Sequence, residues 1–233
     1  MGKSHIKRVA APKSWPINRK LSKWIYRPRS GPHKIEDSIP LGTILKEILN
    51  IVETNKEVKY ILTNGYIKVN GKIRKDQKLP VGLMDIISYK SKHHRILFNQ
   101  KGKIVLVPIK AEESNILIKK ITGKHSIKGN KIQFNFSDGT NLILDNKNAK
   151  VSDTIIFEDN KIKDCLKLEK GALIYITSGG QVGKIGVVDE IKQEKSLNPP
   201  KITFTQEKNK FETIKDYAFV IGKTKPMITL PNE

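Results

Sequence analysis

The chain has 233 residues, with 44 Lys and Arg against 23 Asp and Glu, so its formal net charge is +21. Such a charge is unusual for a soluble enzyme and favours a polyanionic partner, in most cases a nucleic acid. A single cysteine excludes a disulfide framework and a four-cysteine metal site. No apolar run approaches the roughly 18 residues of a membrane span, and no signal-peptide core opens the chain. We therefore expect a soluble intracellular protein with no membrane partner.

Basic residues are concentrated at the amino-terminus, where residues 1–34 hold ten Lys and Arg and neither Asp nor Glu. Four prolines disfavour helix in this segment, and no hydrophobic period of 2 or 3.6 residues continues through it. We therefore expect an extended arm over residues 1–40, without a core of its own, that becomes ordered against a partner.

Three aromatic residues, Trp15, Trp24 and Tyr26, lie among the basic residues of this arm. Flat side chains between cations suit stacking on unpaired bases. The alternative is that they pin the arm to the body of the protein. The sequence alone leaves both interpretations open for each of the three.

The segment 38–64 predicts two helices. Helical spacing of apolar residues along one face indicates the first (Leu41, Ile44, Leu45, Ile48 and Val52). Thr54 with Glu57 three residues later is a capping-box signature that predicts the start of the second. Asn64-Gly65 tolerates the left-handed conformation that ends a helix.

A β-hairpin is predicted next, because apolar and basic residues alternate around Asn70-Gly71, a strong signal for a tight turn. Residues 56–78 carry seven Lys and Arg and two acidic residues. A charge run is most often a solvated face, but this density, next to an acid-free arm, favours contact with phosphates.

From residue 90 onward, short apolar segments separated by turn signals at intervals near ten residues predict β-strands in small barrels. A loop near residue 180 contains Gly179, Gly180 and Gly183, and Gly186 lies in the strand that follows. Glycine there allows a close backbone approach to a phosphate or to a neighbouring strand, and the loop is equally consistent with an ordinary barrel corner.

No catalytic constellation is evident. The sequence lacks H-E-x-x-H, G-x-S-x-G and the glycine-rich loops that bind nucleotide phosphates. We expect no enzymatic activity, cofactor, bound metal or small-molecule substrate.

Five runs of unusual composition are distributed along nearly the whole chain: His5–Lys13 (HIKRVAAPK), Arg27–Lys34 (RPRSGPHK), Ile67–Lys72 (IKVNGK), Pro80–Asp85 (PVGLMD) and Phe219–Lys223 (FVIGK). In these runs the chain resembles the archaeal and eukaryotic type of small-subunit ribosomal protein four. Members of that family usually continue past the Leu-Pro that is Leu230-Pro231 here into a basic tail, whereas this sequence ends at Glu233.

The resemblance implies a mainly β protein with a small α/β module. Its expected parts are an extended basic arm (1–40), a helix-and-hairpin RNA-binding module (41–89), a β-rich central domain (90–168) and a KOW-type small barrel with a C-terminal strand (169–233). The key glycine of the KOW motif corresponds to Gly183.

The resemblance also implies a structural constituent of the small (40S-type) ribosomal subunit, active in translation and subunit assembly. Its implied partners are small-subunit ribosomal RNA and neighbouring ribosomal proteins. The implied location is the cytoplasm, with assembly in the nucleus and nucleolus of a eukaryotic cell. The expected RNA-binding residues come from the arm, the module and the glycine loop: Lys3, His5, Lys7, Arg8, Lys13, Trp15, Arg19, Lys20, Lys23, Arg27, Arg29, His33, Lys34, Lys56, Lys59, Lys68, Asn70, Lys72, Arg74, Lys75, Gly183 and Lys184.

Two alternatives come from other functional classes. An RNA-modifying enzyme such as a pseudouridine synthase can carry the same helix-and-hairpin module, but it needs a Gly-Arg-Leu-Asp-like motif, which is absent. A transcription-associated KOW adaptor would bind a polymerase, and it would have no need of an acid-free basic arm.

Overall fold

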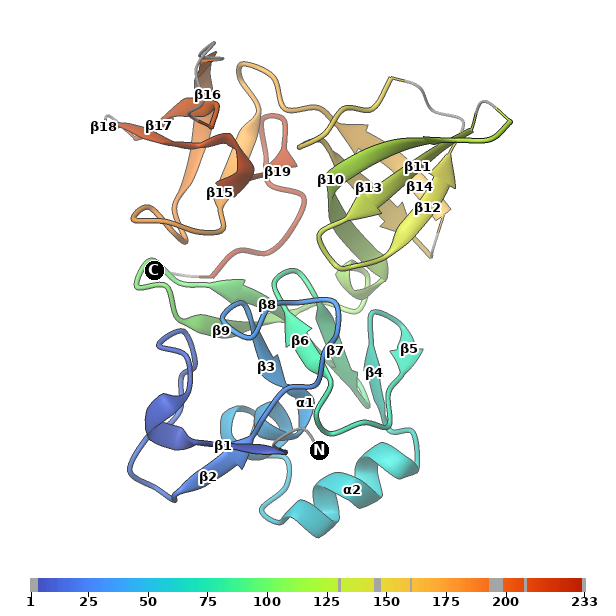
Figure 1. Ribbon diagram of the computed structural model, residues 1–233, viewed down its shortest axis with the longest axis vertical. Helices are drawn as coiled ribbons and strands as arrows, with labels where there is room; N and C mark the ends of the chain where they lie inside the picture. The colour runs from blue at the N-terminus through green and yellow to red at the C-terminus, as the bar shows by residue number, and fades with distance from the viewer. Residues whose placement is uncertain are drawn as a thin grey trace. The chain divides into compact units, whose positions relative to one another are not determined.

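The computed structural model (Figure 1) describes residues 4–129, 131–144, 148–159, 161–192, 199–207 and 209–231. The chain divides into two compact units, one of Met1–Leu97 with Lys103–Asn115 and one of Phe98–Gly102 with Ile116–Glu233. Most of the regular structure is β-strand, as the sequence predicts.

The first unit contains β1 (His5–Lys7), η1 (Arg8–Ala10), β2 (Trp24–Tyr26), β3 (Ser38–Pro40), α1 (Leu41–Thr43), the π-helical segment η2 (Ile44–Ile48), α2 (Asn55–Thr63), β4 (Ile67–Val69), β5 (Lys72–Ile73), β6 (Pro80–Gly82), β7 (Ile86–Tyr89), β8 (Lys92–Phe98), β9 (Ile104–Ile109) and η3 (Glu113–Asn115). Its sheets are β5-β4-β7-β8-β9 and the pairs β1-β2 and β3-β6. Strands β8 and β9 therefore belong to the same sheet as the hairpin.

Both predicted helices are present, and the first is shorter than its apolar pattern suggests. The helical segment made by α1 and η2 ends before Asn50, which adopts a left-handed φ of 49°. Leu41, Ile44 and Leu45 are fully buried, and burial of each such side chain stabilises the fold by roughly 1.5–3 kcal/mol.

The capping box of α2 is confirmed. The Thr54 hydroxyl accepts from the Glu57 amide at 3.3 Å, and the Glu57 carboxylate accepts from the Thr54 hydroxyl at 2.8 Å. Hydrogen bonds, first from the Glu53 amide and then from Thr54, lower the pKa of Glu57 and keep the cap ionised. Figure 1 shows α2 leading directly into the β4–β5 hairpin.

The predicted turn at Asn70-Gly71 is also confirmed. Strands β4 and β5 pair antiparallel around it, with Val69 opposite Lys72. Asn70 and Gly71 both have left-handed φ angles, 51° and 76°, as a type I′ turn requires.

The arm differs from the expectation, because its described residues have buried side chains of their own. Strands β1 and β2 pair antiparallel, with Ile6 opposite Ile25. Trp15, Ile25 and Tyr26 are buried, at 2%, 4% and 8% exposure. Proline and charge content correctly excluded a long helix, but they did not reveal that scattered apolar residues dock this segment on the unit.

The second unit contains two five-stranded antiparallel sheets. The first has the order β12-β11-β10-β13-β14, made of β10 (Ile116–Ile127), β11 (Lys131–Phe136), β12 (Asn141–Leu144), β13 (Thr154–Glu158) and β14 (Lys161–Leu166). The second has the order β18-β17-β16-β15-β19, made of β15 (Leu173–Ile176), β16 (Ile185–Lys192), β17 (Lys201–Gln206), β18 (Asn209–Ile214) and β19 (Ala218–Gly222), with η4 (Lys215–Tyr217) before β19. These sheets agree with the predicted succession of short strands.

A buried lysine links the two sheets of the second unit. Lys120, on β10, is 7% exposed, and its ammonium donates to the carbonyl oxygens of Asp216 (2.6 Å) and Ala218 (2.8 Å). Burial lowers the pKa of Lys120 to about 8, although the nearby Asp216 acts in the opposite direction.

This lowered pKa predicts a pH-dependent stability. Between about pH 8 and 10.5 the unfolded chain holds the Lys120 proton that the folded chain has lost, so the free energy of unfolding should rise with pH through this window. Urea unfolding at several pH values, on wild type and Lys120→Met, measures the effect. The variant should show a shallower rise, and identical pH profiles would contradict the assignment.

Gly183 lies where no side chain fits. Its φ is +80°, and a Cβ atom there would lie 2.4 Å from the carbonyl oxygen of Asn99. Gly180, in the same loop, has no neighbouring heavy atom within 4 Å of a Cβ position.

Replacing Gly183 by Val should therefore reduce the free energy of unfolding by about 3 kcal/mol, through backbone strain and overpacking. Gly180→Val is the matched control and should unfold close to wild type. Thermal melts that do not separate the two variants would show that the close approach is unimportant.

Candidate nucleic-acid interface

The basic residues of the arm divide into internal and exposed groups, and Arg8 belongs to the first. Its side chain is 4% exposed, and its guanidinium forms a two-pronged ion pair with Glu47, with a distance of 2.9 Å between Nη1 and Oε2. The Nε atom also donates to the Ser22 hydroxyl at 2.8 Å. Arg8 was expected at the RNA surface, but in the structure it fastens the arm to the helical segment η2.

Arg19 likewise serves the protein's own backbone. Its guanidinium donates to the carbonyl oxygens of Arg8, Val9, Ala11 and Pro12, at 2.8–3.2 Å. A planar group with five N–H donors suits such a cluster of carbonyls. Arg19 therefore organises the loop that follows β1.

The structure separates the three aromatic residues of the arm. Trp15 is buried, its indole N–H donates to the carbonyl of Ile35 at 3.4 Å, and Tyr26 is buried as well. Trp24 is 52% exposed, and the Lys23 ammonium lies 5.6 Å from the centroid of its ring. Trp15 and Tyr26 thus pin the arm, whereas Trp24 presents a ring and a cation to solvent.

His33 and Asn70 meet at a buried carboxylate rather than at the surface. Asp85 Oδ2 accepts from His33 Nε2 at 2.8 Å and from the Gly82 amide at 2.9 Å, and Oδ1 accepts from the Asn70 side chain at 2.6 Å. Asn70 also accepts from the Ile86 amide at 2.9 Å. Both residues were expected to contact RNA. In the structure they instead join the arm to the hairpin through Asp85.

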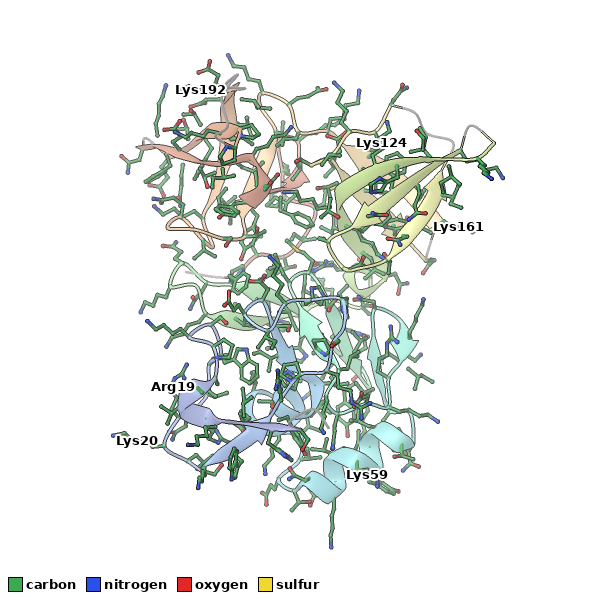
Figure 2. All side chains as sticks on the ribbon, in the orientation of Figure 1. Arg19, Lys20, Lys59, Lys124, Lys161 and Lys192 are labelled. Carbon is green, nitrogen blue, oxygen red and sulfur yellow. The ribbon has the colours of Figure 1, made fainter. Side chains whose placement is uncertain are left out.

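Most of the other residues expected to bind RNA are exposed. Every exposed residue of this set lies in the first unit. Arg27 is half-buried, Lys3 lies outside the described residues, and the remaining arm and module residues have exposed side chains: His5, Lys7, Lys13, Lys20, Lys23, Arg29, Lys34, Lys56, Lys59, Lys68, Lys72, Arg74 and Lys75. Figure 2 shows Lys20 on the arm and Lys59 on α2. These side chains provide positive charge over both the arm and the module.

Sequence reasoning missed two exposed aromatic residues near these cations. Tyr60 on α2 is 65% exposed, and Tyr66, just before β4, is 51% exposed. Their signal in the sequence is weak: Tyr60 lies off the apolar face formed by Val58 and Leu62, beside Lys59.

Gly183 and Lys184 have internal contacts in the second unit. Gly183 is buried against the turn at Asn99, and the Lys184 ammonium lies 3.7 Å from the ring centroid of Phe211 on β18. The structure thus places this glycine against protein, which is one of the alternatives that the sequence left open.

Among the described residues, no cluster of three or more His, Cys, Asp or Glu side chains is arranged to hold a metal ion. No helix in the described ranges is long and apolar enough to cross a membrane.

Comparison with known proteins identifies the family. Residues 1–36 match the family described as the RS4NT (NUC023) domain, and residues 90–164 match Ribosomal family S4e. The chain is 39% identical over 232 residues to small ribosomal subunit protein eS4 of Methanosphaera stadtmanae, with 98% of this chain and 96% of that protein covered. The chain belongs to the ribosomal S4e family. This is a family of structural ribosomal proteins, not of enzymes.

Other S4e proteins agree in extent and fold. Small ribosomal subunit protein eS4 of Archaeoglobus fulgidus is 40% identical over 233 residues, covering 97% of each chain. The crystal structure of the 30S ribosomal protein S4e from Thermoplasma acidophilum is similar, with a TM-score of 0.71 and 33% identity, over 81% of this chain and 96% of that one.

The division of the arm's cations predicts that two adjacent substitutions differ strongly in their effect on stability. Arg8→Gln leaves the Glu47 carboxylate, 13% exposed, without its partner, and should lower the free energy of unfolding by about 3 kcal/mol. Lys7→Gln, at an exposed position, should change it by less than about 0.5 kcal/mol. Chemical denaturation measures both, and equal stability of the two variants would refute the structural role of Arg8.

Proposed function

We propose that this protein is a structural constituent of the small ribosomal subunit and binds small-subunit ribosomal RNA through its first unit. The observation that carries the proposal is the set of exposed cations there, in a segment without acidic residues up to position 34 and on the adjoining helix and hairpin. Lysines and arginines that neutralise phosphates release counterions, which supplies much of the affinity for RNA. The names of the S4e relatives support the assignment to the small subunit.

Within this proposal, recognition depends on RNA shape and on unpaired bases rather than on a linear sequence. Trp24, with the Lys23 ammonium near its ring, and Tyr60, which follows Lys59 in the sequence, offer exposed rings on which such bases stack. Neighbouring small-subunit proteins are further partners, and no membrane or small-molecule substrate takes part. The protein acts on cytoplasmic ribosomes, with assembly in the nucleolus if the cell is eukaryotic.

The remaining parts of the architecture serve as spacers in this proposal. Strands β15–β19 correspond to the KOW-type barrel, with Gly183 as its key glycine, and β10–β14 lie within the family's β-rich central domain (90–168). Both hold the first unit in register on the subunit, and contribute to subunit assembly and translation as scaffold.

Reversing two arm charges tests the proposal. Arg27→Glu with Arg29→Glu should reduce incorporation into small subunits severalfold in competition with wild type, because phosphate contacts become repulsive. The measurement is sucrose-gradient sedimentation of tagged protein from cells, before and after a high-salt wash.

The matched control is Lys161→Glu with Lys167→Glu, which changes the net charge equally at exposed positions of the second unit. Wild type that stays with the small subunit through the wash supports an integral ribosomal component. Incorporation of the arm variant at the control's level would exclude these arginines from the interface, and wild type at the top of the gradient would refute the ribosomal role itself.

A further inference from the structure

A cleft in the first unit lies between the arm and Lys78, two residues before β6. It has a volume of about 580 Å³, and its walls include Arg27, Pro28, Arg29, Lys34, Ile35 and Lys78. This volume lies within the roughly 300–1,000 Å³ typical of sites for small organic molecules, and exceeds what a bare inorganic ion needs.

The cleft carries positive charge that the protein neutralises only in part. Its lining includes no carboxylate. Among the described residues, neither Arg27 nor Lys78 forms an ion pair, and Lys34 is close enough to Asp37 to oppose the rise in the pKa of Asp37 that burial causes. Arg29 pairs with Asp76 at 3.1 Å, and the two side chains are 67% and 38% exposed.

The walls of the cleft are held in place by the fold. The Arg29 amide donates to the Lys78 carbonyl at 3.0 Å, and the Arg27 amide donates to the Ser4 carbonyl at 3.3 Å. Gly31 lies so close to Pro80 that a Cβ atom would approach the proline ring within 2.5 Å. Little conformational entropy is then lost when a ligand enters.

The cleft is lined by cationic side chains and by apolar surface, and together these indicate which kind of ligand fits it. Arginine and lysine side chains suit a phosphate, and guanidinium planes also stack on bases. Pro28 is buried, whereas Ile35, 40% exposed, offers apolar surface at the same cleft. A ligand that is anionic at one end and flat and apolar at the other satisfies both.

We propose that this cleft receives a single unpaired nucleotide of the bound RNA, with its phosphate at the cations and its base against Ile35. The proposal rests on the RNA binding proposed above and adds a specific site to it. Double-stranded RNA does not offer such a nucleotide, because its bases are stacked and paired.

Releasing Arg29 tests the proposal by a gain of binding, which misfolding cannot imitate. Asp76→Asn removes the charge that Arg29 pairs with, and keeps an acceptor for the Lys78 amide, which now bonds Oδ1 at 2.9 Å. Glu158→Gln is the matched control, because it removes the charge paired with Lys163, at 2.9 Å in the second unit. Fluorescence anisotropy of the full-length variants, with a short labelled uridine-rich single strand and the same strand in a duplex, measures affinity.

We expect Asp76→Asn to bind the single strand roughly two- to fivefold more tightly than wild type, with little change for Glu158→Gln or for the duplex. A gain no larger than the control's, or an equal gain for the duplex, would overturn the proposal.

Photo-crosslinking with thiouridine in the same single strand locates the base. Crosslinks within residues 27–35 are the expected result. Binding with crosslinks only elsewhere would refute this cleft while leaving RNA binding intact, whereas wild type that binds neither RNA would refute the proposed function as well.

Discussion

The carboxylate of Asp85 is the point on which the arrangement of the basic surface depends. It accepts hydrogen bonds from the arm at His33, from the hairpin turn at Asn70 and from β6 at Gly82. A buried carboxylate is costly unless donors surround it, so the three segments are required to meet there. Gly82 is part of the requirement, since a Cβ atom there would lie 2.4 Å from the His33 ring. These contacts consequently hold the arm against the hairpin and β6 within the first unit.

Two arginines of the arm form contacts inside the protein and are not available to RNA. Arg8 and Arg19 have planar groups with several donors, and these satisfy a carboxylate and a cluster of carbonyls inside the first unit. The described lysines of the same segment, among them Lys7 and Lys20, are exposed, in keeping with the strong hydration of an ammonium group. A count of basic residues therefore overestimates the charge available to RNA.

Features set by adjacent residues were predictable from the sequence, and features set by distant ones were not. The capping box at Thr54 and the turn at Asn70-Gly71 need only their neighbours, and both are confirmed. Arg8 finds Glu47 39 residues away, and His33 finds Asp85 52 residues away. Residue type suggested RNA contact for Arg8 and His33, because a composition rich in Lys and Arg does not show which cation has a buried partner. For the same reason the sequence did not show that Trp24 is exposed and Trp15 is buried: burial depends on packing against residues distant in the chain.

The glycine loop shows why close approach and phosphate binding are hard to separate in a sequence. Both need a residue without a side chain, and Gly183 meets that need against the carbonyl of Asn99. The neighbouring Lys184 has its ammonium over the ring of Phe211, an arrangement that compensates part of its charge without an anion. Since these two residues have contacts within the second unit, the phosphate contacts of our proposal fall mainly to the first unit. There the cations around Arg27 line a cleft whose backbone is fixed before any ligand arrives.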